Sequence, residues 1–141
     1  MAPADPHPHP VRLDLPNDQA AITRAQDDLI AALEREGYPK ASLFAVRLAV
    51  HEAVTNAFVH GHKSLPSAPV HLEYTVAHDH AEITVRDQGP GFNPADIPDP
   101  TLDENLERGC GRGLLLIRAY MTVAEYNTTG NALRMVYKRP T

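Results

Sequence analysis

The chain has 141 residues, a size typical of one domain, and its 43% hydrophobic and 22% charged residues are typical of a globular protein. Its formal net charge of −5 argues against non-specific binding to nucleic acid or anionic membranes, because both require a cationic surface. The single cysteine, Cys110, excludes an intrachain disulfide, and no apolar run is long enough to span a bilayer. We expect a cytoplasmic protein with a disordered, proline-rich lead-in over residues 1–10 and one domain over residues 11–141.

Hydrophobic periodicity predicts the order strand, helix, helix, strand, strand, long loop, helix, strand, strand. The expected strands cover residues 11–15, 70–77, 81–87, 123–127 and 132–138, and the expected helices cover residues 19–36, 40–61 and 113–121. Tight turns join consecutive strands, so the sheet should be mixed and mainly antiparallel. The predicted fold class is therefore α+β, a two-layer sandwich with helices covering one face of the sheet.

The second predicted helix carries a polar row beside its apolar stripe. Glu52, Asn56 and His60 are spaced four apart and therefore lie on one face of the helix. The Asn56 amide oxygen suits magnesium, and the Glu52 carboxylate can accept a proton from a hydroxyl group. Alternatively, the row is the solvated polar edge of an ordinary helix.

A turn rich in glycine follows the third predicted strand. Asp87, Gly89 and Gly91 form an Asp-x-Gly-x-Gly pattern that puts a carboxylate at the end of the sheet. The glycines allow the backbone to turn sharply and to approach a ligand closely, and the carboxylate can accept a hydrogen bond from an exocyclic amine such as that of adenine. An ordinary Gly-Pro turn is the alternative.

A second glycine pattern, Gly111-Arg112-Gly113, stands immediately before the third predicted helix. Backbone N–H groups and the helix dipole make such a helix start a phosphate site, to which Arg108 and Arg112 can add charge. The other interpretation is a hinge for the preceding loop. The sequence contains no P-loop pattern and no dinucleotide, hydrolase or zinc-protease motif.

The three patterns in this order resemble the GHKL (Bergerat-type, histidine-kinase-like) ATPases, and within them the small anti-sigma factor serine/threonine kinases. EAVTNAFVHG over residues 52–61 is similar to the N-box of that family. RDQGPGF over residues 86–92 and GRGLLLIRAYMT over residues 111–122 are similar to its two glycine boxes. The likeness extends over residues 11–138, nearly the whole chain.

The resemblance implies a site for ATP and Mg²⁺. Asn56 matches the magnesium-binding asparagine, and Glu52 matches the base that deprotonates a serine or threonine hydroxyl of a protein substrate. Asp87 matches the aspartate that binds the adenine amino group, and residues from about 92 to 110 match the ATP lid. The remaining residues expected to contact ATP are His60, Gly89, Gly91, Arg108, Gly111, Arg112, Gly113 and Leu114.

The function implied by the resemblance is that of an anti-sigma regulatory factor. It would phosphorylate an anti-anti-sigma partner of the STAS type, bind a sigma factor, and possess no direct nucleic-acid or membrane contact; the family also suggests a homodimer. An alternative is an ATP-binding module that controls a partner through its lid without phosphoryl transfer. The ATPase piece of a two-component sensor and an α+β domain that binds no nucleotide are further alternatives.

Overall fold

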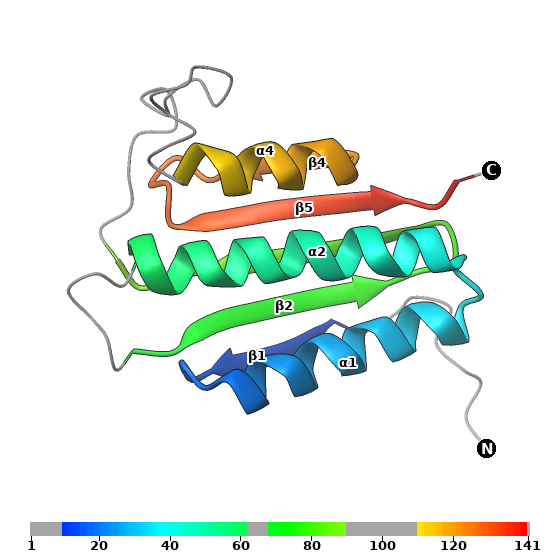
Figure 1. Ribbon diagram of the computed structural model, residues 1–141, viewed down its shortest axis with the longest axis horizontal. Helices are drawn as coiled ribbons and strands as arrows, with labels where there is room; N and C mark the ends of the chain where they lie inside the picture. Colours follow the sequence, from blue (N-terminus) through cyan, green and yellow to red (C-terminus); the bar gives the residue numbers. More distant parts are fainter. Residues whose placement is uncertain (1–9, 62–67, 90–109, 141) are drawn as a thin grey trace.

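The computed structural model describes residues 10–61, 68–89 and 110–140, with the backbone alone at residues 60, 61 and 110–112 (Figure 1). Within these residues the strands are β1 (Val11–Leu15), β2 (Val70–Val76), β3 (His80–Arg86), β4 (Val123–Tyr126) and β5 (Ala132–Lys138). The α-helices are α1 (Gln19–Arg35), α2 (Lys40–Asn56) and α4 (Cys110–Tyr120), and a π-helical turn, Ala57–Gly61, extends α2.

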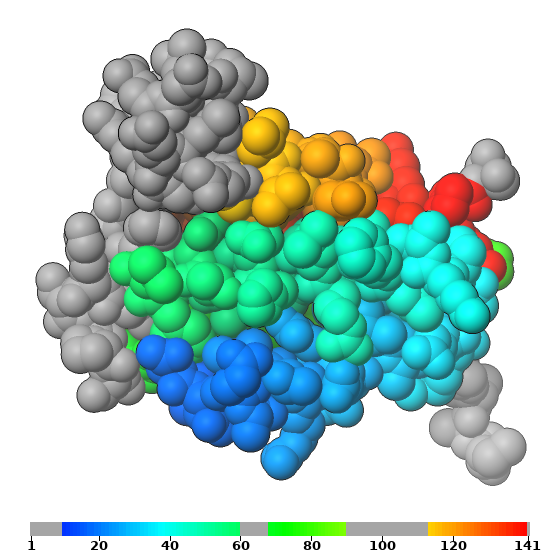
Figure 2. Space-filling model, viewed as in Figure 1, coloured from blue at the N-terminus to red at the C-terminus, as the bar shows by residue number. Residues whose placement is uncertain are grey.

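The five strands form one sheet in the order β1-β2-β3-β5-β4, and each described pairing is antiparallel. The three helices lie side by side over one face of this sheet, with α2 between α1 and α4 (Figure 1). Together they form the face seen in the space-filling view (Figure 2). The predicted α+β two-layer fold is confirmed, and the sheet proves antiparallel throughout the described strands.

Helix α2 packs against the sheet and against both other helices. Its branched stripe, Val46, Val50 and Val54, is at most 1% exposed. A second stripe of alanines at positions 45, 49 and 53 is also buried. These small side chains allow the neighbouring backbone to approach closely, and they leave one polar edge of α2 beside α4.

Helix α1 begins at the predicted residue, Gln19, and ends at Arg35, one residue before the predicted end. The Asp18 carboxylate accepts a hydrogen bond from the backbone N–H of Ala21 and so caps the first turn. Gly37 follows the helix with a φ of 80°, a left-handed conformation that glycine adopts without strain. The N–H groups of Gly37 and Tyr38 donate to the carbonyls of Glu34 and Leu33, which is a Schellman motif.

The face of the sheet away from the helices is polar. Arg134 on β5 contacts Glu82 on β3 and Glu125 on β4 at 2.6 and 3.0 Å, and these hydrogen bonds raise the pKa of its guanidinium. Arg12 on β1 pairs with Glu73 on β2 across the same face. Exposed cross-strand pairs of this kind contribute little stability but keep the surface solvated.

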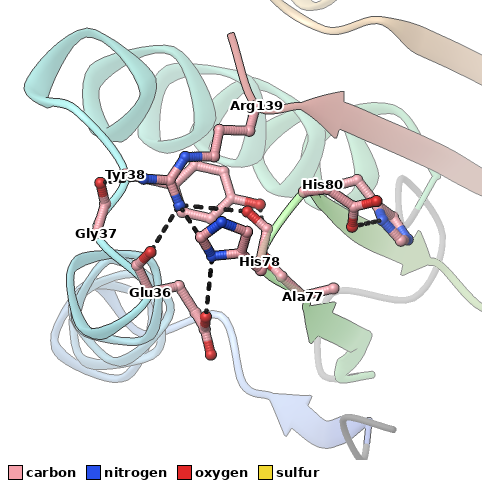
Figure 3. A network of polar contacts seen from close by, with 8 residues as sticks. Glu36, Gly37, Tyr38, Ala77, His78, His80 and Arg139 are labelled. Carbon is pink, nitrogen blue, oxygen red and sulfur yellow. Dashed lines mark hydrogen bonds and ion pairs between the residues drawn. The ribbon is translucent and has the colours of Figure 1, made fainter. Parts of the chain in front are cut away.

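Arg139 fastens the end of β5 to the turn after α1 (Figure 3). Its guanidinium donates to the carbonyls of Glu36 and Gly37 at 2.6 and 2.7 Å and lies 5.0 Å from the ring centre of Tyr38. The Tyr38 hydroxyl donates to the carbonyl of Ala77 at 2.8 Å. Burial raises the pKa of Tyr38 to about 12, although the positive charge of Arg139 opposes the shift.

Three predicted boundaries are corrected. Helix α4 begins at Cys110, three residues earlier than expected, so Gly111 lies inside its first turn rather than before it. Helix α2 gives way to a π turn after Asn56. Strand β3 starts at His80 and ends at Arg86, which places Asp87 after the strand. In the described part of the chain, no helix combines the length and apolar character needed to cross a bilayer.

Candidate nucleotide site

Four segments that are distant in the sequence end at the same edge of the molecule. They are the last turn of α2, the residues after β3, the first turn of α4 and the turn between β4 and β5 (Figure 1). Each sequence motif lies on one of the first three segments. The fold therefore brings the three motifs to one edge of the two-layer sandwich, as the sequence predicts.

Asn56 and Gly113 are in direct contact. A Cβ atom placed on Gly113 would lie 2.6 Å from the Nδ2 atom of Asn56 and 3.1 Å from its Oδ1 atom. Any side chain at position 113 would therefore displace the Asn56 amide. That amide is half buried and has no hydrogen-bond partner among the described residues. It is consequently available to a ligand at the start of α4.

Glu52 lies one turn before Asn56 on the same side of α2 and is half buried. Its carboxylate makes no ion pair or hydrogen bond with a described residue, so it is free to accept a proton. Of the predicted polar row, Glu52 and Asn56 lie on regular α-helix. His60 follows on the π turn, which changes the helical spacing. The His60 side chain lies outside the described residues.

Asp87 is positioned by its neighbours immediately after β3. Its backbone N–H donates to the carbonyl of Asn131 at 2.8 Å, and its Oδ1 atom accepts a hydrogen bond from the buried Gly89 N–H at 2.8 Å. Gln88 donates to the carbonyl of Pro69 at 2.8 Å and so ties this turn to the residues before β2. The Asp87 carboxylate is therefore held in a defined orientation at the edge of the sheet.

Asn127 also supports this region, although none of the sequence motifs includes it. Its Oδ1 atom accepts hydrogen bonds from the backbone N–H groups of Gly130, Asn131 and Ala132 at 2.8–3.2 Å. Gly130 has a φ of 81°, which the turn requires. This turn places the Asn131 carbonyl where it accepts the hydrogen bond from the Asp87 N–H. An asparagine at the start of an Asn-Thr-Thr-Gly turn was the signal that could have identified it.

The start of α4 combines close packing with backbone donors that have no acceptor within the helix. The first four N–H groups of an α-helix have no acceptor within the helix, and in α4 these belong to residues 110–113. Gly113 and Leu114 are both buried, Leu114 with only 3% of its surface exposed. The Arg112 side chain, Gly91, Arg108 and most of the predicted lid lie outside the described residues, so their expected roles stay predictions.

These residues fit a magnesium nucleotide. An amide oxygen with no partner among the described residues, a nearby carboxylate and N–H groups at a helix start are donors and acceptors that metal-bound phosphates require. The described residues hold no cluster of three or more histidine, cysteine, aspartate or glutamate side chains that could bind a metal by themselves. A metal at Asn56 would therefore need ligands beyond the described side chains, and phosphate oxygens can supply them.

Comparison with known proteins also indicates a nucleotide-binding domain. Residues 15–137 match the family model of the histidine kinase-like ATPase domain, and the chain belongs to that family. The chain is 27% identical over 135 residues to a protein named serine-protein kinase RsbW from Oceanobacillus iheyensis, covering 91% of this chain and 85% of that one.

A second relative from Oceanobacillus iheyensis, named anti-sigma F factor, is 36% identical over 86 residues. That match covers 59% of this chain and 58% of the relative, so the chain spans little more than half its length. The fold is similar to a crystal structure of the RsbU and RsbW domains of a Mycobacterium tuberculosis protein, with a TM-score of 0.62 and 17% identity. This similarity covers 93% of the present chain and 32% of that one.

Proposed function

We propose that this protein is an ATP-binding anti-sigma regulatory factor that phosphorylates a serine or threonine of an anti-anti-sigma partner of the STAS type. Membership of the histidine kinase-like ATPase family and the names of the relatives support the proposal. The observation that carries it is the unpartnered Asn56 amide, which lies against Gly113 at the start of α4 and one turn from Glu52.

In this proposal different described residues bind the metal, the adenine and the phosphates. Asn56 holds Mg²⁺ through its amide oxygen, and Asp87 accepts a hydrogen bond from the adenine amino group. Backbone N–H groups in the first turn of α4, including that of Gly113, donate to phosphate oxygens. The further contacts that we assign to ATP are His60, Gly89, Gly91, Arg108, Gly111, Arg112 and Leu114.

Glu52 is the proposed general base. When bound, ATP supplies the phosphoryl group, and Mg²⁺ offsets the charge of its phosphates. A carboxylate oxygen of Glu52 would accept the proton of the substrate hydroxyl. The hydroxyl oxygen would then bond to the γ-phosphorus as the bond from that phosphorus to ADP breaks and ADP leaves. The Glu52 carboxylate is suited to this step because no described cation neutralises it. The fixed orientation of Asp87 keeps the adenine at one end of the site.

The second candidate is an ATP-binding module that acts on a partner without phosphoryl transfer. Glu52 separates the two candidates, because a module that only binds ATP does not need a carboxylate one turn from the metal ligand. We also propose, from the family resemblance, a sigma factor as the second partner, a cytoplasmic location and a homodimer. Residues 1–10 are the proposed lead-in, residues 11–141 the domain, and residues from about 92 to 110 the ATP lid.

Transfer of labelled phosphate tests the proposal directly. The purified chain is incubated with Mg²⁺, γ-³²P-ATP and STAS-domain proteins encoded in the same genome, and the products are mapped by mass spectrometry. We expect one labelled serine or threonine on one of them. Glu52→Gln, which keeps the side chain's size, should bind ATP normally and transfer at least about 100-fold more slowly.

Thr55→Ala is the matched control, because Thr55 is an exposed residue of the same helix. It should transfer phosphate at the wild-type rate. Undiminished transfer by Glu52→Gln would exclude Glu52 as the base. Normal ATP binding with no transfer to any STAS protein would favour the module without kinase activity.

A further inference from the structure

Exposed apolar side chains gather on the outer surface of α2, its π turn and α4. The described residues include five large hydrophobic side chains that are exposed, and four of them lie on these elements. These four are Phe44 (60% exposed), Val59 (54%), Tyr120 (40%) and Leu115 (38%). Half-buried Leu48 and Leu116 continue the surface on α2 and α4. We call these six residues the apolar strip.

The strip follows the line along which α2 and α4 pack, and on α2 the polar residues Glu52 and Asn56 lie between Leu48 and Val59 on the same side of the helix. Figure 2 shows α2, coloured cyan to green, directly beside α4, coloured yellow to orange. The two helices run in opposite directions, because Asn56 near the end of α2 meets Gly113 near the start of α4. At the other end of the pair, Phe44 and Tyr120 make an edge-to-face contact with ring centres 5.9 Å apart.

The charge of this surface differs from that of the whole chain. Helices α2 and α4 contain four cationic residues and one carboxylate, whereas the chain has a net charge of −5. The cations are Lys40, Arg47, Arg112 and Arg118, and the carboxylate is Glu52. Arg47 is already paired with Asp27 of α1 at 2.8 Å, but Lys40 and Arg118 are exposed and have no partner among the described residues.

Among the described residues, the outer side of α1 and the open face of the sheet lack such a combination of exposed apolar and cationic residues. The outer side of α1 is polar and charged, and the open face of the sheet carries the ion pairs of Arg12 and Arg134. Contiguous exposed apolar residues with a polar rim are typical of an interaction site, whereas single ones are not. Paired exposed aromatic rings are the side chains that most often anchor a protein interface.

We propose that the apolar strip is a docking surface for an acidic amphipathic helix of a protein partner. Phe44 and Val59 are fifteen residues apart, so at about 1.5 Å per residue the strip extends about 22 Å, the length of a helix of about fifteen residues. The partner's apolar face lies on the strip, and its Asp or Glu side chains lie beside Lys40 and Arg118. This proposal goes beyond the nucleotide site. A helix that covers the whole strip also lies over Glu52 and Asn56, whereas Phe44, Tyr120 and Lys40 lie at the opposite end of the helix pair.

Three synthetic 18-residue peptides test the proposal. All carry the same leucines at helical spacing, and the intervening positions are glutamate in the first, glutamine in the second and lysine in the third. Binding to the full chain is measured by fluorescence polarisation, and contacts are mapped by NMR. We expect micromolar binding of the glutamate peptide, at least about tenfold weaker binding of the lysine peptide, and a smaller difference at high salt.

Variants identify the surface. Phe44→Ala and Tyr120→Ala should each weaken binding of the glutamate peptide at least about tenfold, and Lys40→Glu should reduce its advantage over the lysine peptide. Val11→Ala is the matched control, because Val11 is a large apolar residue on β1 that is 39% exposed. All four variants should keep the wild-type melting temperature within about 2 °C and bind ATP as the wild type does.

Several results would overturn the proposal. Equal affinity for the three peptides, or full affinity of Phe44→Ala, would remove the acidic helix as the occupant. A dimer that Phe44→Ala converts to monomer, together with no peptide binding, would make the strip an interface between two copies of this chain. Binding to phosphatidylserine vesicles that depends on Phe44 would make it a membrane surface. Because ATP binding is measured in parallel, each of these results is distinguishable from failure of the nucleotide site.

Discussion

Alanine in place of Gly113 tests whether the Asn56 amide must stay where the structure places it. The new Cβ atom would lie 2.6 Å from Nδ2 of Asn56, whereas atoms in ordinary contact are 3.4–4 Å apart. The amide nitrogen therefore has to move by about 0.8 Å to reach ordinary contact. If Asn56 holds the metal, this displacement removes the oxygen from its position without deleting the residue.

Stability and nucleotide affinity should respond differently to Gly113→Ala. Within a helix alanine is favoured over glycine by about 0.5–1 kcal/mol, which offsets the cost of rotating a side chain that makes no hydrogen bond with a described residue. We expect the free energy of unfolding to change by less than about 1 kcal/mol. The affinity for Mg-ATP should fall about 10- to 100-fold, the usual effect of misplacing a metal ligand.

A double-mutant cycle separates this indirect effect from direct obstruction of the phosphates. The assays are urea unfolding and calorimetric titration with Mg-ATP for the wild type, Gly113→Ala, Asn56→Ala and the double variant. If Gly113→Ala acts through Asn56, the double variant should bind no more weakly than Asn56→Ala. Normal affinity of Gly113→Ala would refute the reasoning, and so would a further loss of at least tenfold in the double variant.

Three further predictions concern the rest of the domain. The Gln26 side chain is buried and its Nε2 atom has no hydrogen-bond partner among the residues that the structure describes, so Gln26→Leu should raise the free energy of unfolding in urea by about 1 kcal/mol; a decrease would show that the amide is satisfied. The pKa of Tyr38 is about 12 in the folded protein against 10.0 for an unperturbed tyrosine, so the unfolded chain loses this proton first and stability falls as the pH rises from 10 to 12. Tyr38→Phe should lack that part of the fall, and identical pH profiles from urea unfolding would contradict it. Asn127→Ala should lower the free energy of unfolding by about 1–2 kcal/mol and weaken ATP binding, because the turn that holds Asp87 loses its three hydrogen bonds; calorimetry that shows unchanged affinity would remove Asn127 from the site's support.

Most of the fold could be predicted because the buried apolar residues of its helices and strands recur with strong periodicity. The alternation of Val70, Leu72 and Tyr74 places all three on the buried side of β2, and the valines of α2 recur at helical spacing. The turn after α1 could be predicted equally well, since Gly37 is the left-handed residue that follows the helix. In each case local preference and burial favour the same structure.

The site was less predictable because its geometry depends on contacts between distant segments. Periodicity does not show a π turn after Asn56, and the glycine pattern gave no sign that α4 begins at Cys110. The contact of Asn56 with Gly113 joins residues 57 positions apart, and the hydrogen bond from Asp87 to Asn131 depends on a turn whose own sequence carries no catalytic motif. The sequence identified the residues of the site, whereas their mutual support is visible only in the fold.

Calorimetric titration with ATP, with and without Mg²⁺, tests the central claim most directly when the wild type, Asn56→Ala and Thr55→Ala are compared. We expect micromolar binding by the wild type that weakens at least tenfold without Mg²⁺, the same behaviour in Thr55→Ala, and loss of the magnesium dependence in Asn56→Ala with an unchanged melting temperature. Full magnesium-dependent affinity in Asn56→Ala, or no ATP binding by the folded wild type, would contradict it.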